Sequence, residues 1–343
     1  MIFPDRNFDL ITLGQVLLRL SPPGNGRLAR TNVFEKNVGG AELNVAVGAG
    51  LLGLHTGIIS KIPSHDIGQY MKSTIRSYGV SDDYFIYDNK VDARVGMYFY
   101  EYGAYPRKPQ VIYDRRNSSF FSLKLDEIDP KVFGDTKCFH TSGITLALSE
   151  KLRETTIESI HRFKEQGAII SFDVNFRGNL WSGDEARETI LSILPYVDIF
   201  FCSETTARLT FKKEGNVRDM IRSFTEEFPI KAVFATQRTV HSPKSHDFSS
   251  VAYSAEEKAY YEEKPYERID VVDRIGSGDS YIAGALYGMI KSGGDVKEAV
   301  IYGNATSAMK NTIPGDMPQS GLAEIDEVIK DHYSDGFKSE MNR

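Results

Sequence analysis

The stretch DVVDRIGSGDSYIAGALYG, residues 270–288, decides the fold. Gly276 and Gly278 flank Ser277 directly before Asp279, and Asp279 opens an apolar run with helical spacing. A glycine turn at a helix N-terminus leaves backbone N–H groups without partners, and the helix dipole adds partial positive charge there, so the turn suits phosphate. A carboxylate at the same point can take a proton from an attacking hydroxyl. The stretch therefore predicts phosphoryl transfer to an alcohol. A plain helix cap is the alternative, since Asp and Ser are ordinary cap residues.

A second glycine turn lies near the N-terminus, in VGGAELN, residues 38–44. The pair Gly39 and Gly40 lets a substrate approach the backbone closely, and the helix that follows exposes Asn44 and free amides near its start. The alternative is an ordinary strand-to-helix turn.

Short apolar runs alternate with longer amphipathic ones along the chain, which favours an α/β fold with a mostly parallel sheet and helices on both faces. The expected buried strands are 10–13, 56–62, 168–173, 199–202 and 231–236. The expected helices are 40–52, 67–78, 149–166, 183–194, 217–227 and 279–291.

Two segments break this alternation, and both are strand-like with aromatic residues: 15–34, with a turn at PPGNG, and 94–114. We expect them to form a small β-sheet lid over a ligand cleft. The expected division has three parts. The main α/β domain takes 1–14, 37–92 and 120–334, the lid takes 15–36 and 93–119, and 335–343 is a frayed polar tail.

Composition excludes several classes of protein. The chain has 343 residues, 41% hydrophobic and 26% charged, with a net charge of −6. That acidic balance argues against a nucleic-acid partner but leaves room for an anionic substrate in a basic pocket. Cys138 and Cys202 are too far apart in sequence to suggest a disulfide framework or a zinc site. With no signal peptide and no membrane-spanning run, we expect a cytoplasmic protein with no membrane partner.

One match to a nucleotide motif is a decoy. Residues 48–53, GAGLLG, fit the dinucleotide pattern G-x-G-x-x-G, but that pattern needs a strand before it and a helix after it. Here a helical run precedes the motif and a strand follows it. Small residues in a tightly packed helix explain it better, and a Walker A loop is absent from the sequence.

Further polar residues follow the strand that ends at Asp173. Because ligands gather at the carboxyl ends of parallel strands, Asp173, Asn175 and Arg177 should face the cleft. Arg115 and Arg116 lie in the expected lid, and an arginine fork binds carboxylate or phosphate. Each arginine taken alone is more often a solvated surface charge.

Together these segments resemble the ribokinase-like (PfkB-type) carbohydrate kinases. Residues 39–68 match the first signature of that family. Residues 273–281, DRIGSGDSY, match the second, D-T-x-G-A-G-D-x-[FY], with Arg274 in place of Thr and Ser277 in place of Ala. The resemblance covers nearly the whole chain. Within the family the chain is most similar to 2-keto-3-deoxygluconate kinases, in 17–23, 38–44, 95–98, 173–177 and 310–316.

The resemblance implies roles for particular residues. The sugar would be held by Gly39, Gly40, Asn44 and Asp273, with Tyr98, Tyr113, Arg115 and Arg177 around its carboxylate and keto end. ATP would contact Asn175, Thr236, Arg238, Gly276, Gly278 and Asn304. Asp279 would be the catalytic base, with Gly276, Ser277 and Gly278 forming the anion loop beside it.

Two segments depart from the family pattern. The T-x-G near the nucleotide is replaced by Thr236-Gln237-Arg238, followed by what reads as a long polar loop, 241–250. The magnesium-linked N-x-x-E becomes SETT at 203–206, and Glu204 is the candidate to act on the metal indirectly.

The expectation is an ATP- and Mg²⁺-dependent sugar-acid kinase, with a monovalent cation as a further candidate cofactor and a homo-oligomer formed through the lid. It would convert 2-keto-3-deoxygluconate to the 6-phosphate. Three alternatives remain: a kinase for a neutral sugar such as fructose or ribose, a non-catalytic sugar sensor, and, weakest, a nucleotide-dependent dehydrogenase.

Overall fold

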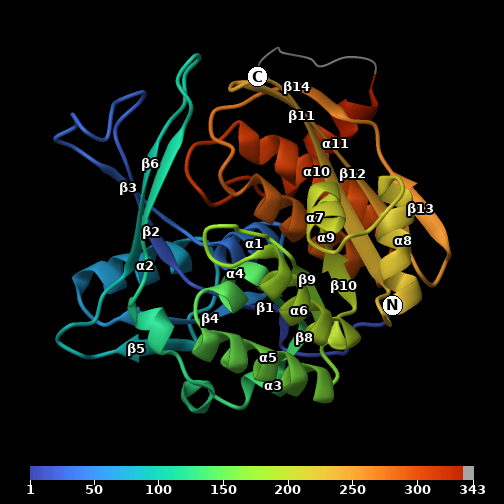
Figure 1. The fold of residues 1–343 in the computed structure, drawn as a ribbon, viewed down its shortest axis with the longest axis horizontal. Helices are drawn as coiled ribbons and strands as arrows, with labels where there is room; N and C mark the ends of the chain where they lie inside the picture. The colour runs from blue at the N-terminus through green and yellow to red at the C-terminus, as the bar shows by residue number, and fades with distance from the viewer. Residues whose placement is uncertain (335–343) are drawn as a thin grey trace.

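The computed structural model describes residues 1–334 and contains a large and a small β-sheet (Figure 1). In spatial order the large sheet runs β13 (Ala259–Glu262), β12 (Ser245–Ser254), β11 (Ala232–Ser242), β10 (Ile199–Phe201), β9 (Ile169–Asp173), β8 (Thr136–Ser142), β1 (Phe8–Leu13), β4 (Thr56–Pro63) and β5 (Phe85–Asp88). A tenth strand, β14 (Tyr266–Asp270), pairs with β12. The predicted tail 335–343 lies outside the described residues.

In the large sheet, strands β11, β10, β9, β8, β1, β4 and β5 are parallel, as the alternation of elements predicted, whereas β12, β13 and β14 pair antiparallel. The antiparallel edge corrects one expectation. Residues 241–250 are not a loop, because β11 continues to Ser242 and pairs residue by residue with β12. Their polar side chains misled the prediction, since the outer part of this hairpin is largely exposed.

Helices cover both faces of the large sheet. One face carries α1 (Ala41–Leu51), α9 (Ser277–Ser292), α10 (Val296–Asn311) and α11 (Leu322–Tyr333). The other carries α3 (Val132–Asp135), α4 (Gly143–Ala147), α5 (Glu150–Glu165), α6 (Gly183–Ile193), α7 (Glu204–Leu209) and α8 (Val217–Glu227). Helix α2 (Asp66–Ser77) packs near β4 in a third core. Short 3₁₀ turns lie at Ser119–Ser122, Leu125–Glu127 and Leu194–Tyr196.

Each face of the large sheet has its own hydrophobic core, and successive side chains along a strand point into opposite cores. In β10, Phe200 packs into the core of the α5–α8 face, and its neighbours Ile199 and Phe201 pack into the core of the α9–α10 face. All three side chains are buried, and burial of each contributes about 1.5–3 kcal/mol. A strand buried on both sides reads as a continuous apolar run, which is why these strands were predictable.

The small sheet is the predicted lid. Its strands run in the order β3 (Glu35–Gly39), β2 (Leu17–Ser21), β6 (Gly96–Glu101) and β7 (Gln110–Asp114). Figure 1 shows it projecting from the side of the main domain. Strand β3 continues to Gly39, three residues past the expected lid boundary at 36, so the first glycine turn joins lid and main domain directly. Within residues 1–334, no helix combines the length and the apolar character needed to cross a membrane.

Candidate active site

Helix α9 begins at the glycine loop that the sequence singled out. Gly276 is its N-cap, with φ at 82°, and the first helical hydrogen bond runs from Ser280 N to Gly276 O (2.8 Å). The amides of Gly278 and Asp279 therefore have no helical carbonyl to bond and can receive an anion. A Cβ on Gly276 would lie 2.0 Å from the carbonyl oxygen of Asp316, so this position requires glycine for both its conformation and its space.

Asp279 lies in the first turn of α9, where Asn44 Nδ2 donates a 2.7 Å hydrogen bond to its Oδ2. Burial raises the pKa of Asp279 to about 7, and the negative charges of Glu42 and Asp316 add to the rise. The hydrogen bond from Asn44 and the charge of Arg177 oppose it. A carboxyl group with a pKa near neutrality is suited to general-base catalysis, because it is ionised near pH 7 and still holds a proton well.

The N-terminal glycine pair meets the same region. A Cβ on Gly39 would lie 2.6 Å from Cβ of Asp316, and one on Gly40 would lie 2.4 Å from the carbonyl oxygen of Gln15. Gly40 is also at φ 144°, which disfavours any side chain. The pair thus brings the start of α1, and Asn44 with it, to the N-terminus of α9. Its contact with a sugar stays a prediction.

Lid residues approach from the opposite side. Tyr98, on β6, donates its hydroxyl to Oδ1 of Asp316, and its ring centroid lies 5.6 Å from that of Tyr113 on β7. The Arg115 guanidinium lies 5.6 Å from the Tyr113 ring, and its Nε donates to Gln15 Oε1 at 2.8 Å. Tyr113 is the most open of the group, at 44% exposure.

Arg115 and Arg177 are available to an anion. Neither forms an ion pair with an acid of residues 1–334. Arg115 donates to the Gln15 side chain, and Arg177 Nη1 donates to the Phe176 carbonyl (3.1 Å). Burial lowers the pKa of Arg115 to about 10, and the charge of Arg177 lowers it further, whereas Tyr113 and Glu42 raise it. Arg115 and Arg177 repel each other, and Arg115 is buried, so binding of a carboxylate or phosphate would stabilise their charged forms.

A cavity of about 260 Å³ lies beside the α9 N-terminus. Its polar lining is Asp173, Asn175, Arg177, Ser203, Thr206, Thr236 and Gly278. Asp173 accepts one hydrogen bond, from Asn175 N to Oδ1 at 3.1 Å. Burial raises the pKa of Asp173 to about 7, and the charge of Asp279 adds to the rise. Asp173 in the cavity lining and Asp279 next to the lining residue Gly278 each have a raised pKa, so a cation would be stabilised here.

A neighbouring cavity of about 440 Å³ contains Ser203, Glu204, Thr236 and Arg238 among its lining residues. Burial lowers the pKa of the Arg238 guanidinium, and the charge of Arg274 contributes. Ser203, the N-cap of α7, and Thr236, on β11, line both this cavity and the 260 Å³ one. The two cavities form a polar region beside the N-terminus of α9.

Two residues predicted to act on the nucleotide or the metal have partners within the protein. Asn304, on α10, is fully buried and accepts a 2.8 Å hydrogen bond from Ser250 Oγ, so the structure places it in the packing under β12. Glu204 lies at the start of α7, where its carboxylate pairs with Arg208 at 3.1 Å. Their contacts with a nucleotide or a metal stay predictions.

Three residues at the site were not predicted from their own positions: Arg19, Glu42 and Asp316. Glu42 is buried and accepts hydrogen bonds from Ser142 Oγ (2.6 Å) and Thr145 Oγ1 (2.7 Å). A charged residue inside the VGGAELN turn was the available signal for Glu42. Arg19 and Asp316 carried a weaker one, an isolated charge within an otherwise apolar or turn-like segment.

An anion loop, a base near neutral pKa and a lid over the cleft define a phosphotransferase site on an α/β fold. Residues 8–319 match the model of the pfkB family carbohydrate kinases. The chain belongs to that family and is a carbohydrate kinase. It is 34% identical to 2-dehydro-3-deoxygalactonokinase of Haloferax volcanii over 94% of this chain and 96% of that one. It is 26% identical to 5-dehydro-2-deoxygluconokinase of Bacillus licheniformis over 95% and 97% of the two chains.

Solved structures confirm the predicted ribokinase-like fold. The 2-dehydro-3-deoxygluconokinase of Thermotoga maritima superimposes with a TM-score of 0.88 at 30% identity, over 94% of this chain and 99% of that one. A ribokinase II from E. coli, solved in complex with ATP and Mg²⁺, shares the fold with a TM-score of 0.80 at 24% identity, over 94% and 99%. Kinases of the family use ATP, as the sequence predicted.

Proposed function

We propose that this kinase phosphorylates the terminal hydroxyl of a 2-keto-3-deoxy sugar acid, with 2-keto-3-deoxygluconate as the substrate and its 6-phosphate as the product. The observation that carries the proposal is the pair Arg115 and Arg177, two guanidinium groups that form no ion pair with an acid of residues 1–334. A neutral sugar gives such a pair nothing to neutralise, whereas a sugar carboxylate does. The names of the relatives support a sugar acid, and they include both the gluconate and the galactonate form.

In the reaction, Asp279 accepts the proton of the C6 hydroxyl as that oxygen attacks the γ-phosphorus of ATP, the bond from this phosphorus to the β,γ-bridging oxygen breaks, and ADP leaves. Asn44 holds the carboxylate by its 2.7 Å hydrogen bond, which leaves the other carboxylate oxygen for the substrate. The amides of Gly278 and Asp279 and the α9 dipole stabilise charge on the transferred group. The lid excludes water, so that the sugar rather than water is the acceptor.

Mg²⁺ neutralises charge on the phosphates when it is bound. Asp173 fits a role toward the metal, since its carboxylate lines the 260 Å³ cavity with one hydrogen bond and a raised pKa. Ser203 and Thr206 offer hydroxyl groups in the same cavity. We propose that Asp173 orients the metal's water ligands, and that Glu204, which faces the adjoining cavity, makes a smaller contribution.

A monovalent cation was a candidate cofactor, and one buried side chain is a candidate to take its place. Lys310 is buried, and its Nζ donates to the carbonyl oxygens of Asp273 (3.3 Å) and Ile313 (3.0 Å), beside the anion loop. We propose that this ammonium supplies the fixed positive charge there. Activity should then be equal in potassium and in choline salts of the same ionic strength.

A homo-oligomer through the lid is supported by β7. This edge strand is exposed along its whole length, and Val111, Ile112 and Tyr113 show apolar surface, as do Val33 and Phe34 of the other lid segment. Exposed edges with apolar residues favour pairing with another chain. Light scattering of the wild type and of Ile112→Lys tests this, because a charge on β7 should give the monomer.

A coupled ATP-consumption assay tests the substrate. The panel should hold 2-keto-3-deoxygluconate, its galactonate epimer, 5-keto-2-deoxygluconate, fructose and ribose. We expect kcat/KM for the 2-keto-3-deoxy acids to exceed that for the neutral sugars. A preference for fructose or ribose would establish the neutral-sugar alternative, and no turnover with any member would favour the sensor.

A further inference from the structure

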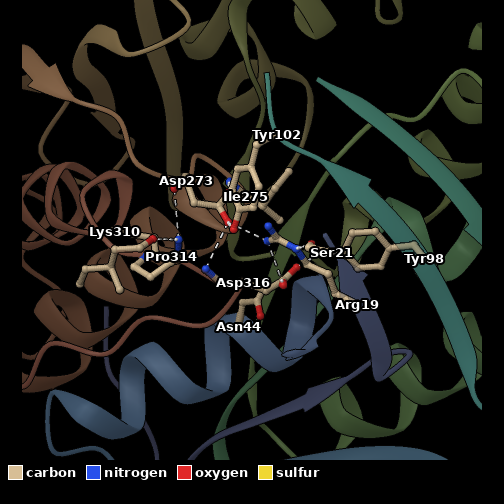
Figure 2. Close-up of polar contacts among 12 residues, drawn as sticks. Arg19, Ser21, Asn44, Tyr98, Tyr102, Asp273, Ile275, Lys310, Pro314 and Asp316 are labelled. Atoms are coloured by element: carbon tan, nitrogen blue, oxygen red, sulfur yellow. Dashed lines mark hydrogen bonds and ion pairs between the residues drawn. The ribbon is translucent and has the colours of Figure 1, made fainter. Parts of the chain in front are cut away.

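Arg19 is a lid residue buried in an ion cluster with the main domain (Figure 2). It lies on β2, its side chain is 0% exposed, and its Nη1 lies 2.7 Å from Asp273 Oδ2 and 3.3 Å from Asp316 Oδ2. Its Nε donates to Ser21 Oγ at 2.9 Å. One guanidinium thus joins two carboxylates that lie 254 and 297 positions further along the chain.

Lid aromatic residues complete the environment of Arg19. Its guanidinium carbon lies 4.4 Å from the ring centroid of Tyr100 and 5.2 Å from that of Tyr102. Tyr102 also donates its hydroxyl to Asp273 Oδ2 at 3.2 Å. Burial favours the neutral form of an arginine, but Asp316 and Asp273 outweigh it and raise the pKa of Arg19 above its ordinary value. Arg19 therefore stays charged.

Both acids that Arg19 contacts also meet the backbone around the anion loop, Asp273 through its carboxylate and Asp316 through its main-chain carbonyl. Asp273 accepts from Ile275 N at Oδ1 (3.0 Å) and from Gly315 N at Oδ2 (3.1 Å), so it joins the loop before α9 to the loop after α10. Asp316 packs its carbonyl oxygen against the bare Cα of Gly276. A shift of either acid would move the N-terminus of α9.

The two buried acids of the cluster depend on Arg19 for their charge balance. Arg19 and Lys310 supply two buried cations for Asp273 and Asp316, and Lys310 bonds the carbonyl oxygen of Asp273, not its carboxylate. Without Arg19, both carboxylates would be buried with no direct cation partner. Buried carboxylates without a cation move toward water or take up a proton, and either change would disturb the anion loop.

We propose that Arg19 is a positioning residue for phosphoryl transfer, which fixes the anion loop and Asp279 through Asp273 and Asp316 and thereby couples the lid to the catalytic loop. Arg19 itself touches no reacting atom. The kinetic part of this proposal rests on the proposed function, whereas the structural part does not.

The test compares Arg19→Met, Arg19→Lys and a matched lid control, Arg94→Met. Arg94 also forms an ion pair in the lid, with Asp114 at 2.8 Å, but that pair is half-exposed and contacts no loop of the main domain. Three quantities are measured for each: kcat, KM for both substrates, and amide hydrogen exchange in peptides covering 273–279 and 312–316.

For Arg19→Met we expect kcat to fall by about 10²-fold, the effect of a displacement near 1 Å at a reacting group, while both KM values change by less than about threefold. Exchange should rise in both loop peptides. Arg19→Lys keeps the charge and loses the fork, so it should change the same quantities less. Arg94→Met should leave all of them at the wild-type values.

A folded Arg19→Met variant with wild-type kcat, or with faster exchange confined to the lid, would overturn the proposal. If Arg19→Met does not fold, Arg19→Lys decides, and wild-type kcat and loop exchange in that variant would likewise overturn it. If wild-type protein phosphorylates no sugar acid, the proposed function fails alone, because the exchange measurements still report on Arg19.

Discussion

Asn44 and Asp279 are 235 positions apart in the sequence, yet a 2.7 Å hydrogen bond joins their side chains. The amide of Asn44 can donate but cannot take the proton of a substrate, so the bond orients the carboxylate without competing for its task. The glycine turn before Asn44 and the glycine turn before Asp279 are thus joined through one atom, Oδ2 of Asp279.

Asp279→Asn should reduce turnover by about 10²–10⁴-fold, the usual effect of losing a general base, with little change in substrate binding. Asp184→Asn is the control, because Asp184 is also an acid in a first helical turn, that of α6, but is exposed. Steady-state kinetics and calorimetric binding measure both. Near-normal turnover of folded Asp279→Asn would show that the mechanism is wrong.

Replacing Arg115 or Arg177 by Met should weaken use of a sugar acid by about 1.5–3 kcal/mol, the worth of a charged hydrogen bond. Residual activity on a neutral sugar should fall much less. Arg116→Met, an exposed neighbour, should alter neither. The measurement is kcat/KM on acid and neutral substrate for each variant, and equal losses on both would assign the arginines a structural role.

The pH dependence should show the ionisation of the base. Asp279 must be ionised to accept a proton, and burial raises its pKa to about 7, so kcat/KM should rise as pH increases through about 7. Asp173 and Asp279 disfavour each other's ionisation. Asp173→Asn removes one negative charge, so the midpoint should move to lower pH. An unmoved midpoint in this variant would mean that the two carboxyl groups are not coupled.

Magnesium dependence separates Asp173 from Glu204. Second-shell groups alter metal affinity by about 10–100-fold, so Asp173→Asn should raise the Mg²⁺ concentration needed for half-maximal rate at saturating ATP. Glu204→Ala should raise it less, and Thr206→Glu, which adds a carboxylate to the cavity, should lower it. Mn²⁺ binding to the enzyme–ADP complex, followed by electron paramagnetic resonance, gives a readout that does not depend on turnover. If only Glu204→Ala moves the curve, the assignment to Asp173 is wrong.

Local signals predicted most of the fold. Helix α9 begins two residues before its predicted start, because a glycine turn followed by helical apolar spacing is a strong local pattern. Helix α10 and strand β12 were missed. Helix α10 buries many small and polar residues, such as Asn304 and Ser307, so its sequence lacks an apolar stripe. Strand β12 is polar where it leaves the core.

The site was partly predictable for the same reason. Glycine turns are strong local signals, so the sequence singled out Gly39, Gly276 and Asp279, and the structure brings them to one region through Asp316 and Asn44. The pairing of Arg19 with Asp273 and Asp316 could not be predicted, because these residues come together only when the lid packs on the main domain. Likewise nothing local shows that Asn304 faces inward, because its burial depends on how β12 lies across α10.

The contact of Gly39 with Asp316 has a consequence for the biosynthesis of this enzyme. The two ends of the chain build one catalytic centre, so a nascent chain on the ribosome carries the lid and most of the sheet long before residue 316 has been made. No amino-terminal fragment that stops before residue 316 can hold both glycine turns in register. We therefore expect a product truncated before residue 316 to lack kinase activity.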